Sequence, residues 1–284
     1  ILAEQHFMTI SRLLSADPAE EGEYTVSAKI GPTDSVVTIA LLVRSLSKKV
    51  KDGVHARIAD GGVDIVIGTH RLVQKDVGFK DLGLVVVDEE HRFGVRHKER
   101  FKQMRAQVDV LTLTATPIPR TLHMALSGLR DMSTMETPPE ERLPIKTYVS
   151  EYSDELVREA ILRELDRGGQ VYLVHNRVRS IGGVANAVRE LAPEATVTIG
   201  HGQMPEEALA EVMADFSRGA ADVLVCTTII ESGLDLPNVN TLIIDRADML
   251  GLAQLYQLRG RVGRSANRAY AYLMVPRNSR ITET

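Results

Sequence analysis

Short, continuous runs of apolar and β-branched residues recur along the chain, and segments with helical spacing separate them. Runs that are apolar throughout are typical of strands buried on both faces, and intervening helices favour parallel pairing. The pattern therefore predicts an α/β fold with two parallel sheets in tandem. The predicted strands lie within residues 36–43, 63–69, 82–90, 108–117, 170–176, 195–202, 221–228, 240–248 and 269–276.

Two irregular stretches interrupt this pattern. Residues 136–146, ETPPEERLPIK, contain three prolines among charged residues, which no helix or central strand accommodates. We expect the boundary between two domains here, with a first domain at 1–138, a linker at 139–146 and a second domain at 147–284. The other stretch, 15–35, is acidic and rich in glycine, proline and hydroxylated residues, and we predict a surface loop.

Composition removes several classes of protein. At 44% hydrophobic and 25% charged residues, the 284-residue chain is an ordinary globular sequence and not a disordered one. A single cysteine, Cys226, excludes a disulfide framework and a cysteine-rich zinc site, and it fits a reducing cytoplasm. The net charge of −4 means that any contact with nucleic acid must use local patches.

Two adjacent carboxylates, Asp88 and Glu89, follow the apolar run 84–87 and precede Glu90 and His91. The carboxyl edge of a parallel sheet is where such folds bind ligands. One carboxylate there can hold hydrated Mg²⁺, and its neighbour can orient or deprotonate an attacking water. The alternative is a solvated acidic turn.

Hydroxyl groups close the next apolar run, where Thr114 and Thr116 flank Ala115 ahead of a proline. They lie one strand–helix unit beyond the carboxylates, and we expect them at the same edge of the sheet. Their other interpretation is helix capping, which is what threonine does most often at a strand-to-helix turn.

The sharpest signal is QLRGRVGR at 257–264. Arg261 and Arg264 are three residues apart, so on a helix they would project from one face. Paired guanidinium groups suit phosphate oxygens, and an arginine can stabilise charge on a transferring phosphoryl group. The alternative is a basic, solvated helix.

Weaker signals and one absence complete the picture. IGTHR at 67–71 and CTT at 226–228 end predicted strands with small or hydroxylated residues, which can grip a sugar-phosphate backbone or form ordinary turns. No lysine follows a glycine, so the chain contains no GxxxxGK[ST] phosphate loop. It also contains no GxGxxG, which removes the main reason to propose a dinucleotide-dependent oxidoreductase.

Taken in order, DEEH, TATP and QLRGRVGR resemble motifs II, III and VI of superfamily 2 helicases. ILAEQH, IGTHR, VYLVHNRV and TTIIESGLDLPNVNTLI are similar to the end of motif Ia and to motifs Ib, IV and V. The resemblance implies two tandem RecA-like domains. It also implies that the first lacks its Walker A strand and loop, because that loop precedes motif Ia in the family.

Two branches of the superfamily share DEEHRFGVRHKERFK and TATPIPRTL with variations: the transcription-repair coupling factors (Mfd) and the RecG-type branch-migration helicases. LHMALSGLRDMSTMETPP, GHGQM and the run from CTTIIESGLDLP to QLRGRVGRS resemble the coupling factors more. The sequence is therefore identified as coupling-factor-like.

The resemblance assigns roles in ATP hydrolysis to residues that match the motifs. Asp88 would coordinate Mg²⁺ through water and Glu89 would activate the hydrolytic water. Arg261 and Arg264 would be arginine fingers. The supporting residues would be Gln257 for positioning, His91, Thr114 and Thr116 for coupling nucleotide state to DNA, and Gly233 and Asp235 for approaching the nucleotide from the second domain.

The residues that would track the DNA backbone are Gly68, Thr69, His70, Arg71, Thr227 and Thr228. The implied parent is a bacterial, cytoplasmic, ATP-dependent translocase on double-stranded DNA. In the family it displaces stalled RNA polymerase and recruits the excision-repair protein UvrA, through regions outside this chain. We expect the chain to be a fragment that starts within motif Ia and is ATPase-deficient alone. The alternatives are a RecG-type enzyme at stalled replication forks and a non-catalytic nucleic-acid-binding remnant.

Overall fold

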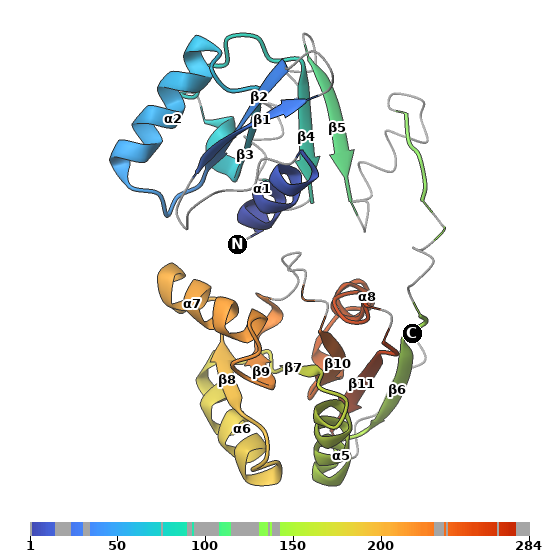
Figure 1. Ribbon diagram of the computed structural model, residues 1–284. Coiled ribbons are helices and arrows are strands. Elements are labelled where there is room, and N and C mark those ends of the chain that lie inside the picture. The colour runs from blue at the N-terminus through green and yellow to red at the C-terminus, as the bar shows by residue number, and fades with distance from the viewer. Residues whose placement is uncertain are drawn as a thin grey trace. The chain divides into compact units, whose positions relative to one another are not determined.

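The computed structural model divides the chain into two compact units, Ile1–Thr134 and Met135–Thr284 (Figure 1). Unit 1 and unit 2 are both α/β, and parallel strand pairs occur in each, which confirms the predicted fold class. The structure describes residues 2–14, 24–30, 35–74, 76–89, 93, 108–114, 131–135, 137, 143–229, 236, 238–265 and 267–276.

A three-stranded sheet in unit 1 has the order β1 (Thr25–Ile30), β2 (Ser35–Leu42) and β3 (Ile65–Gly68). β2 and β3 are parallel, whereas β1 is antiparallel to β2. The prediction of a loop throughout 15–35 is therefore wrong for β1. Its Val26 and Ala28 are buried while Ser27 and Lys29 are exposed, and this alternation is too short to stand out in a polar stretch.

Two helices cover β2, because the residues along a strand point alternately to its two faces. Ile39 and Leu41 pack with α1 (Leu2–Leu13) on one side. On the other side Ala40 and Leu42 pack with α2 (Lys48–Asp60). Ser47 caps the start of α2 by accepting a hydrogen bond from the N–H of Val50 at 3.4 Å.

A parallel pair, β4 (Leu84–Asp88) and β5 (Asp109–Leu113), forms a second sheet in unit 1. The short helix η1 (His70–Val73) follows β3, and its Val73 clusters with Val87 of β4. This contact sets β4 beside the turn that follows β3.

Unit 2 contains a six-stranded parallel sheet in which the central strands are buried along their whole length. This burial explains why their sequences are continuous apolar runs. The strand order is β6 (Lys146–Glu151), β11 (Tyr270–Val275), β10 (Val239–Ile244), β7 (Gln170–Val174), β9 (Val223–Cys226) and β8 (Val197–Gly200).

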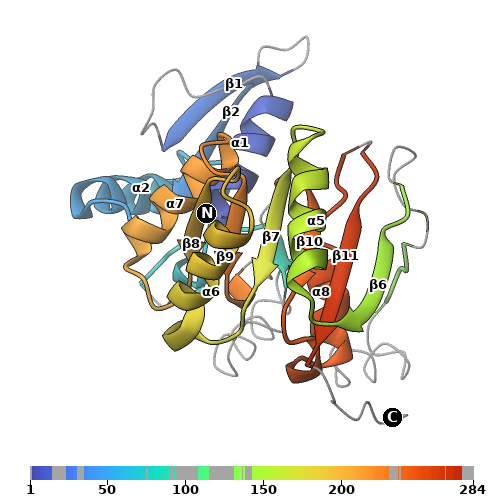
Figure 2. The same cartoon turned by 90° about the horizontal axis from the view of Figure 1, so that it is seen from below.

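Helices cover both faces of this sheet, giving three layers (Figure 2). α5 (Asp154–Leu165) and α6 (Val178–Leu191) pack on one face. α7 (Glu206–Ser217) and α8 (Leu252–Arg259) pack on the other, and η4 (Ala247–Met249) joins β10 to α8. The loops that leave the carboxyl ends of all six strands therefore share one edge.

Within the described residues, no helix is long and apolar enough to cross a membrane. Cys226, the last residue of β9, has no exposed surface, and burial raises the pKa of its thiol. It is a core residue.

Candidate functional site

The acidic turn of unit 1 is built by the parallel pairing of β4 with β5. The register places Asp88 opposite Leu113, and the backbone N–H of Glu89 donates to the carbonyl oxygen of Leu113 at 3.1 Å. Asp88, Glu89 and Thr114 therefore lie together at the carboxyl edge of this sheet. This is the arrangement that parallel pairing of two strands produces.

Glu89 has a backbone φ of 52°, in the left-handed region. Among the residues that the structure describes, it is the one non-glycine residue with positive φ. This conformation is uncommon for glutamate and costs about 1 kcal/mol or more, and residues that retain it cluster at functional sites. The strain indicates that the position of this carboxylate is held by its surroundings.

His6 of α1 lies beside the acidic turn, although sequence reasoning did not select it. Its Nε2 is 3.5 Å from Oδ2 of Asp88, and the two side chains are 49% and 38% exposed. No local pattern predicts this contact beyond the position of His6 in ILAEQH, because 82 residues separate His6 from Asp88.

Four predicted site residues, His91, Thr116, Gly233 and Asp235, lie outside the described residues. Their roles stay predictions.

Four predicted DNA contacts, Gly68 to Arg71, lie at the last residue of β3 and in the turn that follows it. A Cβ on Gly68 would lie 2.3 Å from the carbonyl oxygen of Leu42, so the close approach of β3 to β2 requires glycine here. Arg71 is bound to a neighbouring carboxylate. Its Nη1 and Nη2 donate to the two oxygens of Asp76 at 2.7 and 2.5 Å, and Nη1 also donates to Gln74.

In unit 2, Thr227 and Thr228 follow β9 at the carboxyl edge of the sheet. Thr227 is buried and its N–H donates to the carbonyl oxygen of Gly200, at the end of β8, at 3.3 Å. The structure thus places this predicted pair at a strand edge, on a turn anchored to its neighbour.

The predicted phosphate-binding arginines do not lie on a helix. α8 contains Gln257 but ends at Arg259, and Gly263 has a φ of 69°. The expectation that Arg261 and Arg264 share a helical face is wrong, because glycines at 260 and 263 turn the chain. The side chains of Gln257, Arg261 and Arg264 are all half-buried. The N–H of Gly263 donates to the carbonyl oxygen of Val239 at 3.4 Å, so this turn lies at the amino end of β10.

A hydrogen-bonded chain around a buried histidine, at the carboxyl edge of unit 2, also escaped sequence reasoning. His175 Nδ1 lies 2.5 Å from Oδ2 of Asp245, and its Nε2 lies 2.7 Å from Oγ of Ser180. Burial raises the pKa of Asp245, while the hydrogen bond with His175 opposes the rise. The histidine and the aspartate follow adjacent strands that are 70 residues apart in sequence, so only the strand order could have joined them.

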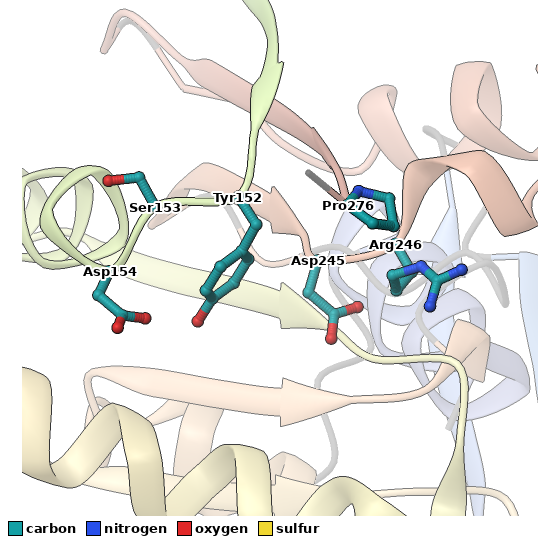
Figure 3. A pocket seen from close by; sticks show the side chains of 6 residues that line it. All are labelled: Tyr152, Ser153, Asp154, Asp245, Arg246 and Pro276. Atoms are coloured by element: carbon teal, nitrogen blue, oxygen red, sulfur yellow. The ribbon is translucent and has the colours of Figure 1, made fainter. Parts of the chain in front are cut away.

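A pocket of about 500 Å³ opens beside Asp245, over the carboxyl ends of β6, β10 and β11 (Figure 3). Burial, helped by Asp154, raises the pKa of Tyr152 to about 12, so its hydroxyl keeps its proton at neutral pH. The lining residues are Tyr152, Ser153, Asp154, Asp245, Arg246 and Pro276.

The acidic turn fits Mg²⁺ in one particular way. Among the described side chains, no group of three or more histidine, cysteine, aspartate or glutamate residues converges to hold a metal. Mg²⁺ keeps several waters and is often held by one or two carboxylates together with substrate phosphates. The accessible carboxylate of Asp88 at a strand end suits that mode.

Known families match both units. Residues 1–125 match the family described as DEAD/DEAH box helicase, and residues 153–266 match the helicase conserved C-terminal domain. Each match lies within one of the two units, and the two units are RecA-like helicase domains.

Curated relatives narrow the resemblance. The chain is 60% identical over 246 residues, 87% of its length, to the transcription-repair-coupling factor of Escherichia coli (strain K12). It is 54% identical over 283 residues, 100% of its length, to that of Bacillus subtilis (strain 168). These alignments confirm the resemblance predicted from the sequence. The chain covers 21% and 22% of these two relatives, about a fifth of their length.

Solved structures show the same fold. The structure of RecG bound to a three-way DNA junction superposes with a TM-score of 0.71 at 33% identity. It covers 98% of this chain and 35% of the RecG chain. The helicase MrfA bound to DNA and AMPPNP superposes with a TM-score of 0.70 over 98% of this chain and 40% of its own. At 14% identity, that second likeness shows the fold alone.

Proposed function

We propose that the chain is the motor segment of an ATP-dependent translocase on double-stranded DNA that acts in transcription-coupled repair. The observation that carries this proposal is the 54% identity to a transcription-repair-coupling factor along 283 residues, which include both helicase domains. The acidic turn, with Asp88 and Glu89, and the arginine turn, residues 260–264, supply side chains of the types that ATP hydrolysis needs.

For the chemistry, Asp88 would hold Mg²⁺ through water, and the bound ion would neutralise charge on the phosphates. The Glu89 carboxylate would orient the attacking water and take its proton. Arg261 and Arg264 would stabilise the charge on the transferring phosphoryl group. Gln257, His91, Thr114, Thr116, Gly233 and Asp235 would have the supporting roles that the motifs assign.

The DNA contacts would be made by the turns after β3 and β9. Gly68, Thr69 and His70 precede Arg71 in the first turn, and Thr227 and Thr228 form the second. Backbone N–H groups and hydroxyls contact phosphates without reading bases, which suits an enzyme that travels along any sequence.

The biological role extends beyond this chain. In the proposed role the whole protein displaces stalled RNA polymerase and recruits UvrA, and both partners would bind outside these residues. Support comes from the relatives, which are named for coupling transcription to repair.

The deciding experiment measures ATP hydrolysis by the full-length protein with and without duplex DNA. We expect duplex DNA to stimulate turnover. Binding of DNA with no hydrolysis would overturn the proposal and favour the non-catalytic remnant. Residues 1–284 alone, which lack a GxxxxGK[ST] loop, should hydrolyse ATP poorly, and DNA-stimulated turnover by them would contradict this expectation.

A RecG-type role is the second candidate, favoured by the superposition on RecG bound to a three-way junction. The two roles predict different substrates. A coupling factor should release RNA polymerase from a stalled elongation complex, whereas a RecG-type enzyme should remodel three-way junctions and leave the stalled complex intact.

A further inference from the structure

His175 occupies a junction of three neighbouring strands at the carboxyl edge of unit 2. It directly follows β7, which lies between β10 and β9 in the sheet. Its backbone N–H donates to the carbonyl oxygen of Cys226, the last residue of β9, at 2.8 Å. The N–H of Asp245 donates to Val174, the last residue of β7, at 3.3 Å. The ends of β9, β7 and β10 are thus joined around this histidine.

The imidazole of His175 extends this junction to a helix. Nδ1 contacts the Asp245 carboxylate after β10, and Nε2 contacts the hydroxyl of Ser180 in the first turn of α6. Both ring nitrogens are therefore engaged, and the residue is only 8% exposed. The other oxygen of Asp245 is buried with no hydrogen-bond partner in the described structure, and Arg246 stabilises the carboxylate together with the imidazole.

The junction lies at the edge of unit 2 where DNA contacts are proposed. Thr227 and Thr228 directly follow Cys226, whose carbonyl oxygen accepts the hydrogen bond from the backbone N–H of His175. The start of α6, held through Ser180, presents the exposed side chains of Arg177 and Arg179. His175 itself is too buried to contact a phosphate along a passing duplex.

We propose that His175 is a positioning residue for nucleic-acid binding, whose imidazole holds the start of α6, with Arg177 and Arg179, in one fixed arrangement with the end of β10. This inference rests on the proposed function, because it concerns how the same edge binds DNA. The imidazole acts through Asp245 and Ser180 and does not touch the DNA.

The test compares His175→Ala, Ser180→Ala and the double variant in the full-length protein. We expect His175→Ala to raise the apparent Kd for a blunt-ended duplex about tenfold, and Ser180→Ala to raise it less. Because both act through one bridge, the double variant should bind like His175→Ala alone. His175→Gln, which retains an amide donor, should recover part of the affinity. Hydrolysis without DNA should stay at the wild-type rate.

Thr241→Val is the matched control for a loss of stability. Thr241 is buried at the other end of β10, where its hydroxyl donates to Glu164. Thr241→Val should lower the Tm by about as much as His175→Ala does, and it should leave the duplex Kd unchanged.

Three results would overturn the proposal: a wild-type Kd for His175→Ala, effects of His175→Ala and Ser180→Ala that multiply in the double variant, or an equal loss of DNA affinity in Thr241→Val. A wild-type protein without DNA-stimulated hydrolysis would instead refute the proposed function, so the two failures are distinguishable.

Discussion

Glu89 is tied to Leu113 by a hydrogen bond of 3.1 Å, from the backbone N–H of the glutamate to the carbonyl oxygen of the leucine. The bond crosses from β4 to β5 at the point where both strands end. It continues the ladder by one residue and fixes the turn in which Glu89 takes its positive φ. The backbone that carries the carboxylate is thereby held at the end of the paired strands.

Glu89→Gln tests the proposed role of this carboxylate. The amide keeps the shape of the side chain but cannot take a proton. In the full-length protein ATP binding should persist, while kcat for hydrolysis should fall by about 10²-fold or more. Glu155→Gln, in the exposed first turn of α5, is the control and should leave the rate unchanged. Near-normal turnover of Glu89→Gln would remove the residue from the chemistry.

Arg264→Ala tests the arginine turn. If its guanidinium stabilises the transferring phosphoryl group, kcat should fall about 10³-fold with little change in folding. Arg218→Ala removes an exposed arginine paired with Asp215 and should have no effect on the rate. Equal rates for the two variants would remove Arg264 from the chemistry.

Gly68→Ala should destabilise the first unit. The added Cβ would lie 2.3 Å from Leu42 O and 2.9 Å from Leu72 Cγ, so backbone must shift. Overpacking of this kind costs about 1–3 kcal/mol of the free energy of unfolding. Gly78→Ala, where a Cβ meets nothing within 4 Å, should change it by less than about 0.5 kcal/mol. Denaturant unfolding measures both, and similar losses would contradict the packing argument.

Asp76→Ala should strengthen DNA binding if Arg71 is a backbone contact. The substitution releases the guanidinium from its bidentate partner and leaves it available to a phosphate. Duplex affinity should rise, and the slope of log K against log salt should steepen by up to about 0.9. Asp215→Ala releases Arg218 in the same way on α7 and is the control. An unchanged slope for Asp76→Ala would argue against contact by Arg71.

The same pair predicts a pH dependence. The hydrogen bonds from Arg71 hold the pKa of Asp76 below its ordinary value of about 3.9. Because the folded-state pKa is the lower one, the stabilisation by this pair is fully present above the ordinary pKa and is lost as pH falls through the folded-state pKa. A carboxyl NMR titration should place the midpoint of Asp76 below that of an unpaired aspartate, and Arg71→Gln should return it to the ordinary range. A wild-type midpoint at the ordinary value would disprove the pairing in solution.

Sequence reasoning succeeded where burial is continuous. QVYLV of β7 is apolar because both faces of the strand are covered, so its pattern predicts a central strand without ambiguity. TVSAKI of β1 alternates over only six residues within a polar stretch, and the loop prediction there failed. The spacing of Arg261 and Arg264 also misled, because glycine at 260 already marked the end of the helix.

The part of the site that could be predicted consists of residues that end neighbouring strands. Asp88 and Glu89 follow an apolar run, and the parallel order places Thr114 beside them. Contacts between distant segments, such as His6 with Asp88, depend on how helices pack on the sheet, and local patterns do not encode that packing. The predicted roles of His91, Thr116, Gly233 and Asp235 stay predictions.

β10 joins the two edges of the sheet in the second unit. Its six buried residues span about 20 Å, and strands on both sides clamp it with hydrogen bonds. Val239, at one end, receives the N–H of Gly263 between the two arginines, and Asp245 follows the other end. The pairing of β10 with β7 shifts register between Val239 and Thr241, at the end beside the arginines, and stays in order from Thr241 to Ile244. β10 therefore spans the sheet from the turn that contains Arg261 and Arg264 to the edge where Asp245 contacts His175, so one strand joins the two places.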